Sequence, residues 1–410
     1  MVTNFTDKIE RGEKLFGEGN YGEAEIVFRE ILTRNRNQKQ VWNNLGVIEF
    51  RKNNLAEALK CFELALQIDS SYREAYDNLM AIKQRLGGES VQVNQPEYYV
   101  HDKKIAIVNI WENKFNNIYK SYFERNNDVK VIIPRTGQEL QSAVEWADVL
   151  WSTWCNEPLI ALSQYRLPCK LITHIRSYEI LTESFMTNAK WENIDGAIFV
   201  AEHIREIAGE MWPVQMSQVP KTVVHNCVDP DKYPFYEKQP GKNIAYVSYL
   251  NHKKGISLLL QCIKSAVNCD PEYKFHIAGI HQEPRFEVYM NHLLKAMNLQ
   301  DNVIFHGWVK DIQKFMADMD YSISTSPWEG CPNNVIEAMA CGVKTIVHNW
   351  RGAQDMFPED LVFNSIDDFM RILTEEKYDS KYYREFVETN FNAEIQVNKI
   401  DKFMAEILRK

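Results

Sequence analysis

The chain lacks several features that would place it in a broad class of protein. No run approaches the roughly 20 apolar residues that a membrane-spanning helix needs, although peripheral contact with a membrane is left open. Lysine and arginine form no long run, and the net charge is −9. Nucleic acid is therefore not an expected partner, because binding its phosphates requires a concentrated basic face. The N-terminal stretch MVTNFTDKIERGEKLF carries charges where a signal peptide has an apolar core.

The cysteines exclude two further architectures. The eight cysteines form no CxxC pair and no zinc-ligand spacing, so neither a disulfide framework nor a zinc site is expected. Scattered thiols of this kind indicate reduced, mostly buried cysteines in a cytoplasmic protein. With 410 residues, 45% of them hydrophobic, the chain can form two or three domains.

The first eighty or so residues are helical in pattern and repeat. Like residues recur 34 positions apart in four pairs: Gly12 and Gly46, Asn20 and Asn54, Ala24 and Ala58, and Phe28 and Phe62. This is the period of the tetratricopeptide repeat. A partial third unit around Tyr76 and Leu79 predicts a closing helix, so residues 1–88 are expected to form a short α-solenoid, followed by a linker over residues 89–103.

Stacked repeats of this kind bind peptides or proteins on a concave face. Asn44 and Asn78 occupy equivalent positions, where side-chain amides can hold an extended peptide backbone. Two alternatives stay open: asparagine is common at this repeat position, and short stacks also serve as packing or homo-oligomer surfaces.

The rest of the chain alternates apolar strand patterns with helical ones, which predicts doubly wound parallel sheets. Strands are expected in the following segments: 104–111, 129–134, 147–153, 169–175, 196–201, 221–226, 242–249, 275–279, 303–308, 321–324 and 344–349. We expect two Rossmann-like domains, over residues 104–233 and 234–380. An amphipathic helix over residues 381–410 is expected to cross back to the first of them.

The segment Ser324–Gly342, STSPWEGCPNNVIEAMACG, is the most informative part of the chain. It predicts a strand, a loop carrying Glu329 and a helix carrying Glu337. The first turn of such a helix has free backbone N–H groups and the positive end of the helix dipole, so it can bind an anion. Two carboxylates beside such an entrance suit a nucleotide-sugar, whose diphosphate lies between two polyhydroxylated groups.

This segment resembles the E-x7-E signature of retaining GT-B glycosyltransferases. The stretch from His306 to Asp320 resembles the sequence that precedes this signature in the family. The resemblance covers roughly residues 100–410 and is stronger in the second half. It implies that Glu329 contacts the donor sugar and that Glu337 binds the ribose. The intervening loop would contact the donor through these residues: Gly330, Cys331, Pro332, Asn333 and Asn334.

The resemblance assigns further residues to the donor site. Lys254, followed by glycine, matches the lysine that neutralises the donor diphosphate, and Gly279 matches a glycine that lets the nucleotide approach. Backbone groups near Trp308 and Val309 would read the base. His174, at the carboxyl end of a predicted strand, resembles the histidine near the donor sugar, and a lone structural histidine is the alternative. Arg176 and Glu179 are weaker candidates for acceptor contacts.

The chain departs from the family pattern at several positions. Tyr249 replaces the arginine that pairs with the lysine of the diphosphate site, which removes a bidentate guanidinium. A hydrogen bond from Tyr249, or the charge of Lys253 or Arg285, would compensate. Ile110-Trp111-Glu112-Asn113 stands where the family has a glycine-rich loop. Asp318-Met319-Asp320 spells the DxD metal motif of other glycosyltransferases, but it lies at the end of an amphipathic helix, so no metal is expected.

These observations imply a retaining, metal-independent glycosyltransferase that needs no cofactor and takes a UDP-sugar, with UDP-GlcNAc first by analogy. The fused repeats favour a protein Ser/Thr acceptor on a bacterial polypeptide, with flagellin as an example. One alternative is assembly of surface polysaccharide or lipid-linked glycan. The other is a non-catalytic scaffold that binds nucleotide-sugars, which Tyr249 in place of arginine suggests.

Overall fold

The computed structural model describes residues 5–34, 38–68, 72–85, 98–110 and 114–410. The first nine residues of the predicted linker, 89–97, and residues 111–113 of the segment that replaces the glycine-rich loop lie outside the described residues. The chain divides into two compact units: residues 1–95 with 353–362, and residues 96–352 with 363–410. Each unit is described by itself.

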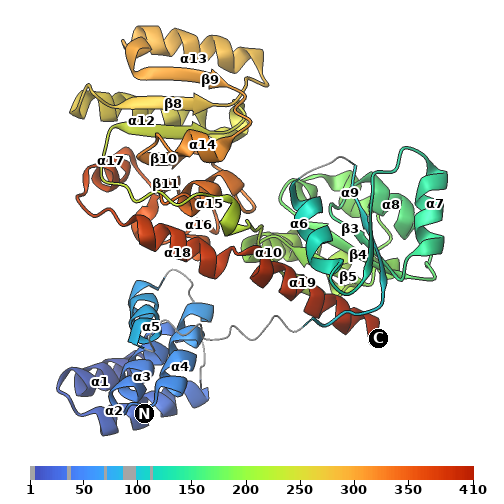
Figure 1. Cartoon of the computed structure of the whole chain (residues 1–410), viewed down its shortest axis with the longest axis horizontal. Coiled ribbons are helices and arrows are strands. Elements are labelled where there is room, and N and C mark those ends of the chain that lie inside the picture. Colours follow the sequence, from blue (N-terminus) through green and yellow to red (C-terminus); the bar gives the residue numbers. More distant parts are fainter. Residues whose placement is uncertain (1–4, 35–37, 69–71, 86–97, 111–113) are drawn as a thin grey trace. The chain divides into compact units, whose positions relative to one another are not determined.

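The first unit contains the five described helices of the repeat region (Figure 1). They are α1 (Phe5–Gly17), α2 (Tyr21–Arg34), α3 (Lys39–Arg51), α4 (Leu55–Ile68) and α5 (Arg73–Arg85). Helices α1 and α2 pack as one pair and α3 and α4 as the next, with α5 against α4. This arrangement confirms the predicted α-solenoid of helical repeats.

The 34-residue spacing has a steric cause. A Cβ atom on Gly12 would lie 2.5 Å from the ring of Phe28, and one on Gly46 would lie 2.5 Å from the ring of Phe62. Both phenylalanines are fully buried. In each pair, therefore, a glycine on the first helix makes room for the aromatic ring of the second helix.

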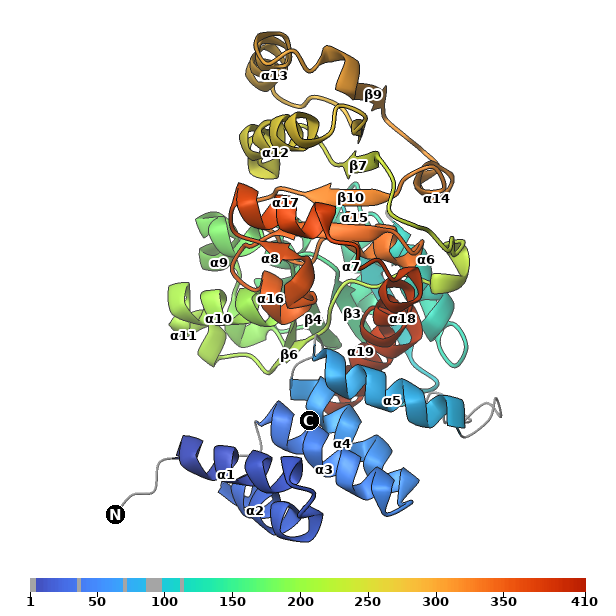
Figure 2. The same ribbon diagram turned by 90° about the vertical axis from the view of Figure 1, so that its left-hand side faces the viewer.

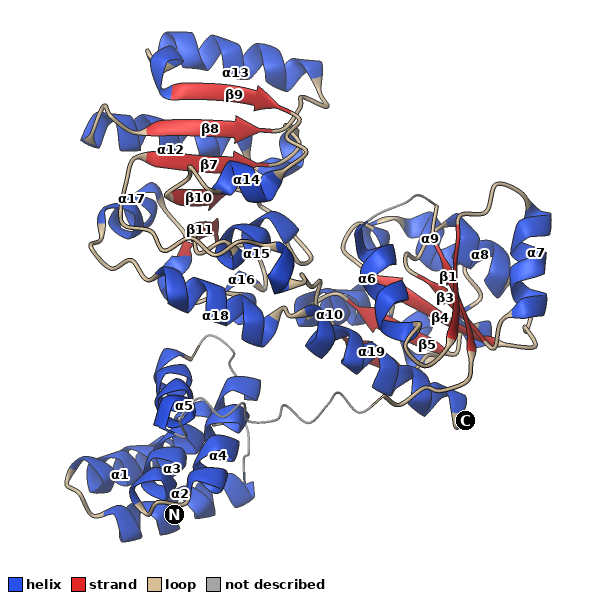
Figure 3. Ribbon diagram, viewed as in Figure 1, coloured by secondary structure: helices blue, strands red, loops and turns tan. Residues whose placement is uncertain are grey.

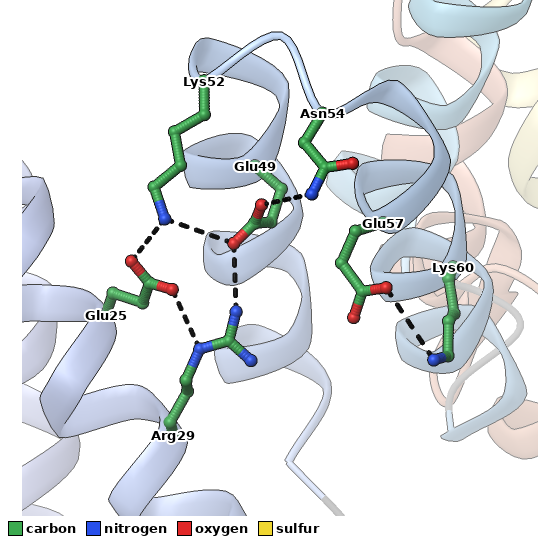
Figure 4. Close-up of polar contacts among 7 residues, drawn as sticks. All are labelled: Glu25, Arg29, Glu49, Lys52, Asn54, Glu57 and Lys60. Carbon is green, nitrogen blue, oxygen red and sulfur yellow. Dashed lines mark hydrogen bonds and ion pairs between the residues drawn. The ribbon is translucent and has the colours of Figure 1, made fainter.

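A buried carboxylate joins the two helix pairs (Figure 4). Only 5% of the Glu49 side chain is exposed. Its oxygens accept hydrogen bonds from Arg29 at 3.0 Å, Lys52 at 3.3 Å and Asn54 at 3.0 Å. Glu25 bonds the same Arg29 and Lys52 from α2. Because every oxygen of Glu49 has a donor, this cluster serves as a structural contact between repeats.

Two six-stranded sheets are formed by the second unit, with residue 362 of the first unit contributing to the last strand. The first sheet has the order β2-β1-β3-β4-β5-β6, and its neighbouring strands are parallel. Its strands are β1 (Lys104–Val108), β2 (Asp128–Ile132), β3 (Val149–Ser152), β4 (Lys170–Ile175), β5 (Gly196–Phe199) and β6 (Lys221–Val223). The helices between them are α6 (Lys114–Phe123), α7 (Gly137–Trp146), α8 (Glu157–Ser163), α9 (Glu183–Asn188), α10 (Glu202–Met211) and α11 (Pro213–Ser217).

The second sheet has the order β12-β11-β10-β7-β8-β9. Its strands are β7 (Asn243–Val247), β8 (Lys274–Ala278), β9 (Val303–Gly307), β10 (Tyr321–Ser324), β11 (Lys344–His348) and β12 (Val362–Phe363). Its helices are α12 (Ile256–Cys269), α13 (Pro284–Ala296), α14 (Ile312–Met316), α15 (Asn333–Ala340), α16 (Ala353–Met356) and α17 (Ile366–Thr374). Figure 2 shows α12, α13 and α17 on one side of this sheet, with α14 on the other.

The predicted strands lie at the positions expected from the sequence. Central strands such as β3, β5 and β10 are buried along their whole length, as strands covered on both faces are. The edge strands β2 and β9 are partly exposed. Figure 3 shows each sheet with helices around it. The chain therefore has two doubly wound α/β domains, as predicted.

The C-terminal segment contains two helices where one was expected, α18 (Ser380–Asn390) and α19 (Ala393–Leu408). They are separated at Phe391, whose carbonyl accepts a hydrogen bond from the backbone of Val228 at 2.9 Å. Helix α19 then packs on the first sheet, where Phe403 contacts the position that Gly196 keeps free of a side chain. Among the helices that the structure describes, none has the length and apolar character required to cross a membrane.

Candidate active site

A cavity of about 750 Å³ lies at the carboxyl ends of the strands and is lined from both sheet domains. This is where open α/β sheets bind ligands. The cavity brings together most of the residues predicted from the sequence, namely Arg176, Tyr249, Lys254, Gly279, Trp308, Val309, Glu329, Cys331, Pro332, Asn333, Asn334 and Glu337. The first domain also contributes Phe115, Trp154 and Asn226 to the cavity wall.

The loop between β10 and α15 forms one wall of the cavity. Helix α15 begins after Pro332, whose side chain offers no capping hydrogen bond. The first backbone N–H groups of α15 are thus free of a side-chain cap at a cavity wall. Such a helix entrance favours an anion.

Two side chains of the first domain hold the backbone of this loop, and one side chain at the end of the loop bonds the second sheet. His203 of α10 makes a hydrogen bond of 2.9 Å with the carbonyl oxygen of Glu329, and Asn226 donates to the carbonyl of Cys331 at 2.8 Å. Asn334 donates to the carbonyl of Val247 in β7 at 3.0 Å. Because residues of both domains hold the loop, its position is defined before any ligand binds.

Lys254 lies opposite this loop and pairs with it. Its ammonium nitrogen is 2.5 Å from Oε1 of Glu329, and both side chains are mostly buried. The carbonyl of Lys254 accepts hydrogen bonds from the hydroxyls of Tyr246 at 2.7 Å and Thr325 at 2.9 Å. The two hydroxyls fix the backbone of Lys254, so its ammonium group has a defined place in the cavity.

Two glycines allow this close approach. Gly255 has a φ of 66°, and a Cβ atom there would lie 1.9 Å from the carbonyl oxygen of Thr325. A Cβ atom on Gly279 would lie 1.8 Å from the carbonyl oxygen of Ser248. Gly255 therefore lets the segment that carries Lys254 approach the end of β10, and Gly279 lets the end of β8 approach the end of β7.

Glu337 lies one turn inside α15 and is 9% exposed. Its Oε1 accepts a hydrogen bond from the Tyr233 hydroxyl at 3.0 Å. Burial, and then the charge of Glu337, raise the pKa of Tyr233, so the phenol stays a donor. The rings of Tyr249 and Trp308 also pack together, with centroids 5.4 Å apart and an angle of 32° between their planes. Tyr249 thus forms part of an aromatic surface beside the cavity.

The two cations proposed to compensate for the missing family arginine are not among the lining residues. Lys253 and Arg285 are exposed, and neither lines the cavity. The described cations that line it are Arg176, Lys254 and Lys310.

Arg176 lies at the wall contributed by the first domain and is only 6% exposed. Its guanidinium lies over the rings of Trp154 and Phe115, 4.7 and 5.0 Å from their centroids. Nη1 donates to Oδ1 of Asn226 at 2.5 Å. Arg176, Asn226 and Cys331 therefore form a hydrogen-bonded chain from the first domain to the Glu329 loop.

His174 lies near the end of β4, as predicted, but it is 0% exposed and does not line the cavity. Its ring stacks on Trp151 at 6.3 Å. Burial, and then the charge of Arg176, hold the pKa of His174 well below its usual value, against a weaker effect of the Val224 backbone. His174 is thus a neutral ring beneath the cavity, and its contact with a sugar remains a prediction.

Four other predicted residues also lie off the cavity wall. Gly330 faces Val200 and Ser177 of the first domain, where a Cβ atom would come within 3.0 Å. Glu179 is fully buried and accepts the backbone N–H of Arg176 at 3.2 Å. Asn44 and Asn78 lie in the repeat unit, where Asn78 donates to Asn43 at 2.9 Å. This hydrogen bond occupies an N–H group of the Asn78 amide that was predicted to bind a peptide.

Sequence reasoning missed the residues that support the site: His203, Asn226, Tyr233, Tyr246 and Thr325. A weak signal existed for two of them, because His203 follows β5 and Asn226 follows β6, at strand ends where such sheets place functional groups. The other three are supporting hydroxyls that carry no motif.

The DxD stretch has a structural role at its second aspartate. Asp320 accepts the backbone N–H of Asn243 at 2.9 Å, at the start of β7. Its carboxylate also occupies the space beside Gly241. Among the described residues, no three His, Cys, Asp or Glu side chains form a group that could hold a metal ion.

Comparison with known proteins identifies the domains. Residues 230–405 match the family model "Glycosyl transferases group 1", and residues 40–72 match the tetratricopeptide repeat model. The glycosyl transferases group 1 model thus matches somewhat less than half of the chain, which has the GT-B fold and an N-terminal tetratricopeptide repeat region.

Individual relatives are distant. An uncharacterized glycosyltransferase of Methanocaldococcus jannaschii is 25% identical over 170 residues, which cover 40% of each chain. The poly(ribitol-phosphate) alpha-N-acetylglucosaminyltransferase of Staphylococcus aureus is 29% identical over 30% of this chain and 24% of its own length. The chain thus spans less than half the length of these curated relatives. HepE of Anabaena, solved with UDP and glucose, has a TM-score of 0.61 over 74% of this chain and 100% of its own, at 14% identity, a likeness of fold.

Proposed function

We propose that this protein is a retaining glycosyltransferase that moves a sugar from a nucleoside diphosphate to an acceptor without a metal ion. One observation carries the proposal: Lys254 and Glu329 form an ion pair in the cavity where the uncapped end of α15 begins. The ammonium group and the free N–H groups of α15 supply positive charge for a diphosphate. Glu337 offers a carboxylate to the ribose from inside the same helix.

The proposed chemistry relies on fixed charges. As the bond between the sugar and the diphosphate breaks, negative charge grows on the phosphate oxygens, and Lys254 and α15 stabilise it in place. Glu329 and the backbone of the loop orient the sugar, so Glu329 acts by position and charge and is not assigned as a nucleophile. His174, neutral and buried beneath the cavity, supports the sugar side of the site.

For the donor we propose a UDP-sugar, with UDP-GlcNAc as first choice. Two relatives support this choice, an alpha-N-acetylglucosaminyltransferase and a UDP-Gal-dependent galactosyltransferase. Solved GT-B structures of similar fold also contain UDP.

For the acceptor we propose a Ser/Thr side chain of a cytoplasmic protein, such as a bacterial flagellin, recruited by the repeats. The repeat match over residues 40–72 supports recruitment of a protein. Arg176, on the wall contributed by the first domain, is the proposed acceptor-side contact within the cavity.

A second candidate is transfer to a surface polymer or a lipid-linked glycan. The names of relatives favour it, since they specify poly(ribitol-phosphate), a lipopolysaccharide core and a diphosphoundecaprenol acceptor. In that case the repeats would recruit partner proteins and not the acceptor.

A panel of nucleoside-diphosphate sugars tests the proposal, with released nucleotide measured in the presence and absence of cell extract. Turnover of one donor is expected, and mass spectrometry of labelled products would then separate protein from glycan acceptors. Binding of nucleotide-sugar with no turnover under any condition would favour the non-catalytic scaffold.

A further inference from the structure

The guanidinium of Arg176 is buried without a counter-anion of its own. Arg176 is 6% exposed, yet Nε and Nη2 make no hydrogen bond within the described chain. Nη1 bonds a neutral amide, that of Asn226. A buried charge with free donors is costly unless it is paired.

Burial has the larger effect on the pKa of the Glu179 carboxyl group and the charge of Arg176 opposes it by lowering this pKa, but Glu179 makes no hydrogen bond with the guanidinium. Glu179 accepts the backbone N–H of Arg176, and its other oxygen makes no hydrogen bond in the described residues. Burial raises the pKa of Glu179 to about 7, so near neutral pH it is only partly charged. Burial also raises the pKa of Tyr119 to about 12, with Arg176 opposing, which leaves that neighbour neutral as well.

The surroundings of Arg176 suit an oxyanion. The rings of Phe115 and Trp154 flank the guanidinium and exclude water from it. A planar fork of this kind matches the geometry of a phosphate or carboxylate. Hydrogen bonds through Asn226 to Cys331 link the Arg176 guanidinium to the loop that leads into α15.

We propose that Arg176 binds a phosphate or carboxylate group of a substrate in this cavity, beside the loop that leads into α15. Two sources supply that chemistry: the diphosphate of the donor, or an anionic group on the acceptor. If the donor diphosphate is the source, Arg176 would take the role of the family arginine that Tyr249 replaces in this chain. The inference rests on the proposed function only for naming these sources.

Calorimetry and thermal shifts on the full chain test the proposal, with inorganic phosphate, pyrophosphate and UDP as probes. The variants are Arg176→Gln, which removes the charge, and Arg176→Lys, which keeps the charge without the fork. Arg205→Gln is the matched control, because Arg205 is an exposed arginine on α10 that pairs with Glu202 away from the cavity. Lys254→Gln tests the proposed function separately.

The expected result is that Arg176→Gln weakens phosphate binding about 10- to 100-fold, as for loss of charge-assisted hydrogen bonds. Arg176→Lys should be intermediate, and Arg205→Gln should bind like the wild type. A parallel loss of UDP and pyrophosphate affinity would identify the donor diphosphate as the source, and unchanged UDP affinity would identify the acceptor.

Equal binding of all three probes by wild type and Arg176→Gln would overturn the proposal, as would a wild type that binds none of them. A purely structural Arg176 would lower the melting temperature of the ligand-free variant and leave the ligand-induced shift intact. If Lys254→Gln leaves UDP affinity unchanged while Arg176→Gln abolishes phosphate binding, the proposed function fails and the anion site stands.

Discussion

The ammonium group of Lys254 lies 2.5 Å from the carboxylate of Glu329, although the two residues are 75 positions apart. The sequence assigned them to different parts of a donor, Lys254 to the diphosphate and Glu329 to the sugar. Their pairing means that the charge of Lys254 is already balanced in the ligand-free protein. An incoming diphosphate must therefore share Lys254 with Glu329.

Substitutions at this pair should separate binding from transfer. In Glu329→Gln the ammonium group loses its carboxylate, so UDP should bind as well as or more tightly than in the wild type, while transfer falls about 100-fold. In Lys254→Gln both UDP binding and transfer should fall. Titration calorimetry and nucleotide release measure the two effects. Lys253→Gln, an exposed neighbour that does not line the cavity, is the control, and a Glu329→Gln variant with full transfer would contradict the assignment.

Glu179 should make the stability of the protein depend on pH. Burial raises its pKa from 4.5 to about 7 in the folded chain, so the folded state holds a proton that the unfolded state releases. The stabilisation is fully present below about pH 4.5 and is lost as the pH rises through 7, by about 3 kcal/mol. Glu179→Gln should therefore gain melting temperature relative to the wild type between pH 5 and pH 8. A difference that is constant over this range would show that Glu179 does not titrate there.

Gly255 and Gly209 should respond to alanine in opposite ways. At Gly255 a Cβ atom would lie 1.9 Å from the carbonyl oxygen of Thr325, and φ is positive, so Gly255→Ala should destabilise the chain by about 3 kcal/mol or more. Gly209 lies within α10 with nothing within 4 Å of the added carbon, so Gly209→Ala should stabilise it by about 0.5–1 kcal/mol. Thermal melts measure both. Equal melting temperatures would contradict the close packing at Lys254.

Glu49 should be required for the order of the repeats. Its carboxylate accepts from Arg29, Lys52 and Asn54, and Glu49→Ala would leave these donors without their shared acceptor, at a cost of about 1–3 kcal/mol. Hydrogen exchange of the full chain should then quicken in α2 to α4 and stay unchanged in the two sheets. Lys60→Ala, at an exposed pair with Glu57, is the control. Unchanged exchange in Glu49→Ala would show that the buried cluster contributes nothing.

Much of the fold could be predicted from the sequence because its signals are local. Parallel strands buried on both faces appear as apolar runs, as in β1 and β5. The repeat pairs Gly12–Phe28 and Gly46–Phe62 reflect a steric fit that recurs every 34 residues. The break between α18 and α19 was not predicted. It depends on the backbone of Val228, far away in sequence, which bonds Phe391.

The candidate site likewise has a part that the sequence predicts and a part that it does not. The loop from Glu329 to Asn334 is contiguous, so its motif could be read directly. The supports that fix it join residues 105 and 126 positions apart, Asn226 with Cys331 and His203 with Glu329, and no local pattern records such pairings. His174 lies at the predicted strand end, but the burial of its ring depends on residues such as Trp151 that pack around it.

A crystal structure of the chain with UDP bound tests the central claim most directly. We expect the diphosphate to lie against the first turn of α15, with an oxygen within hydrogen-bond distance of the Lys254 ammonium. We expect the ribose to lie against Glu337. A nucleotide bound elsewhere, with Lys254 and Glu329 still paired only to each other and the α15 entrance empty, would contradict it.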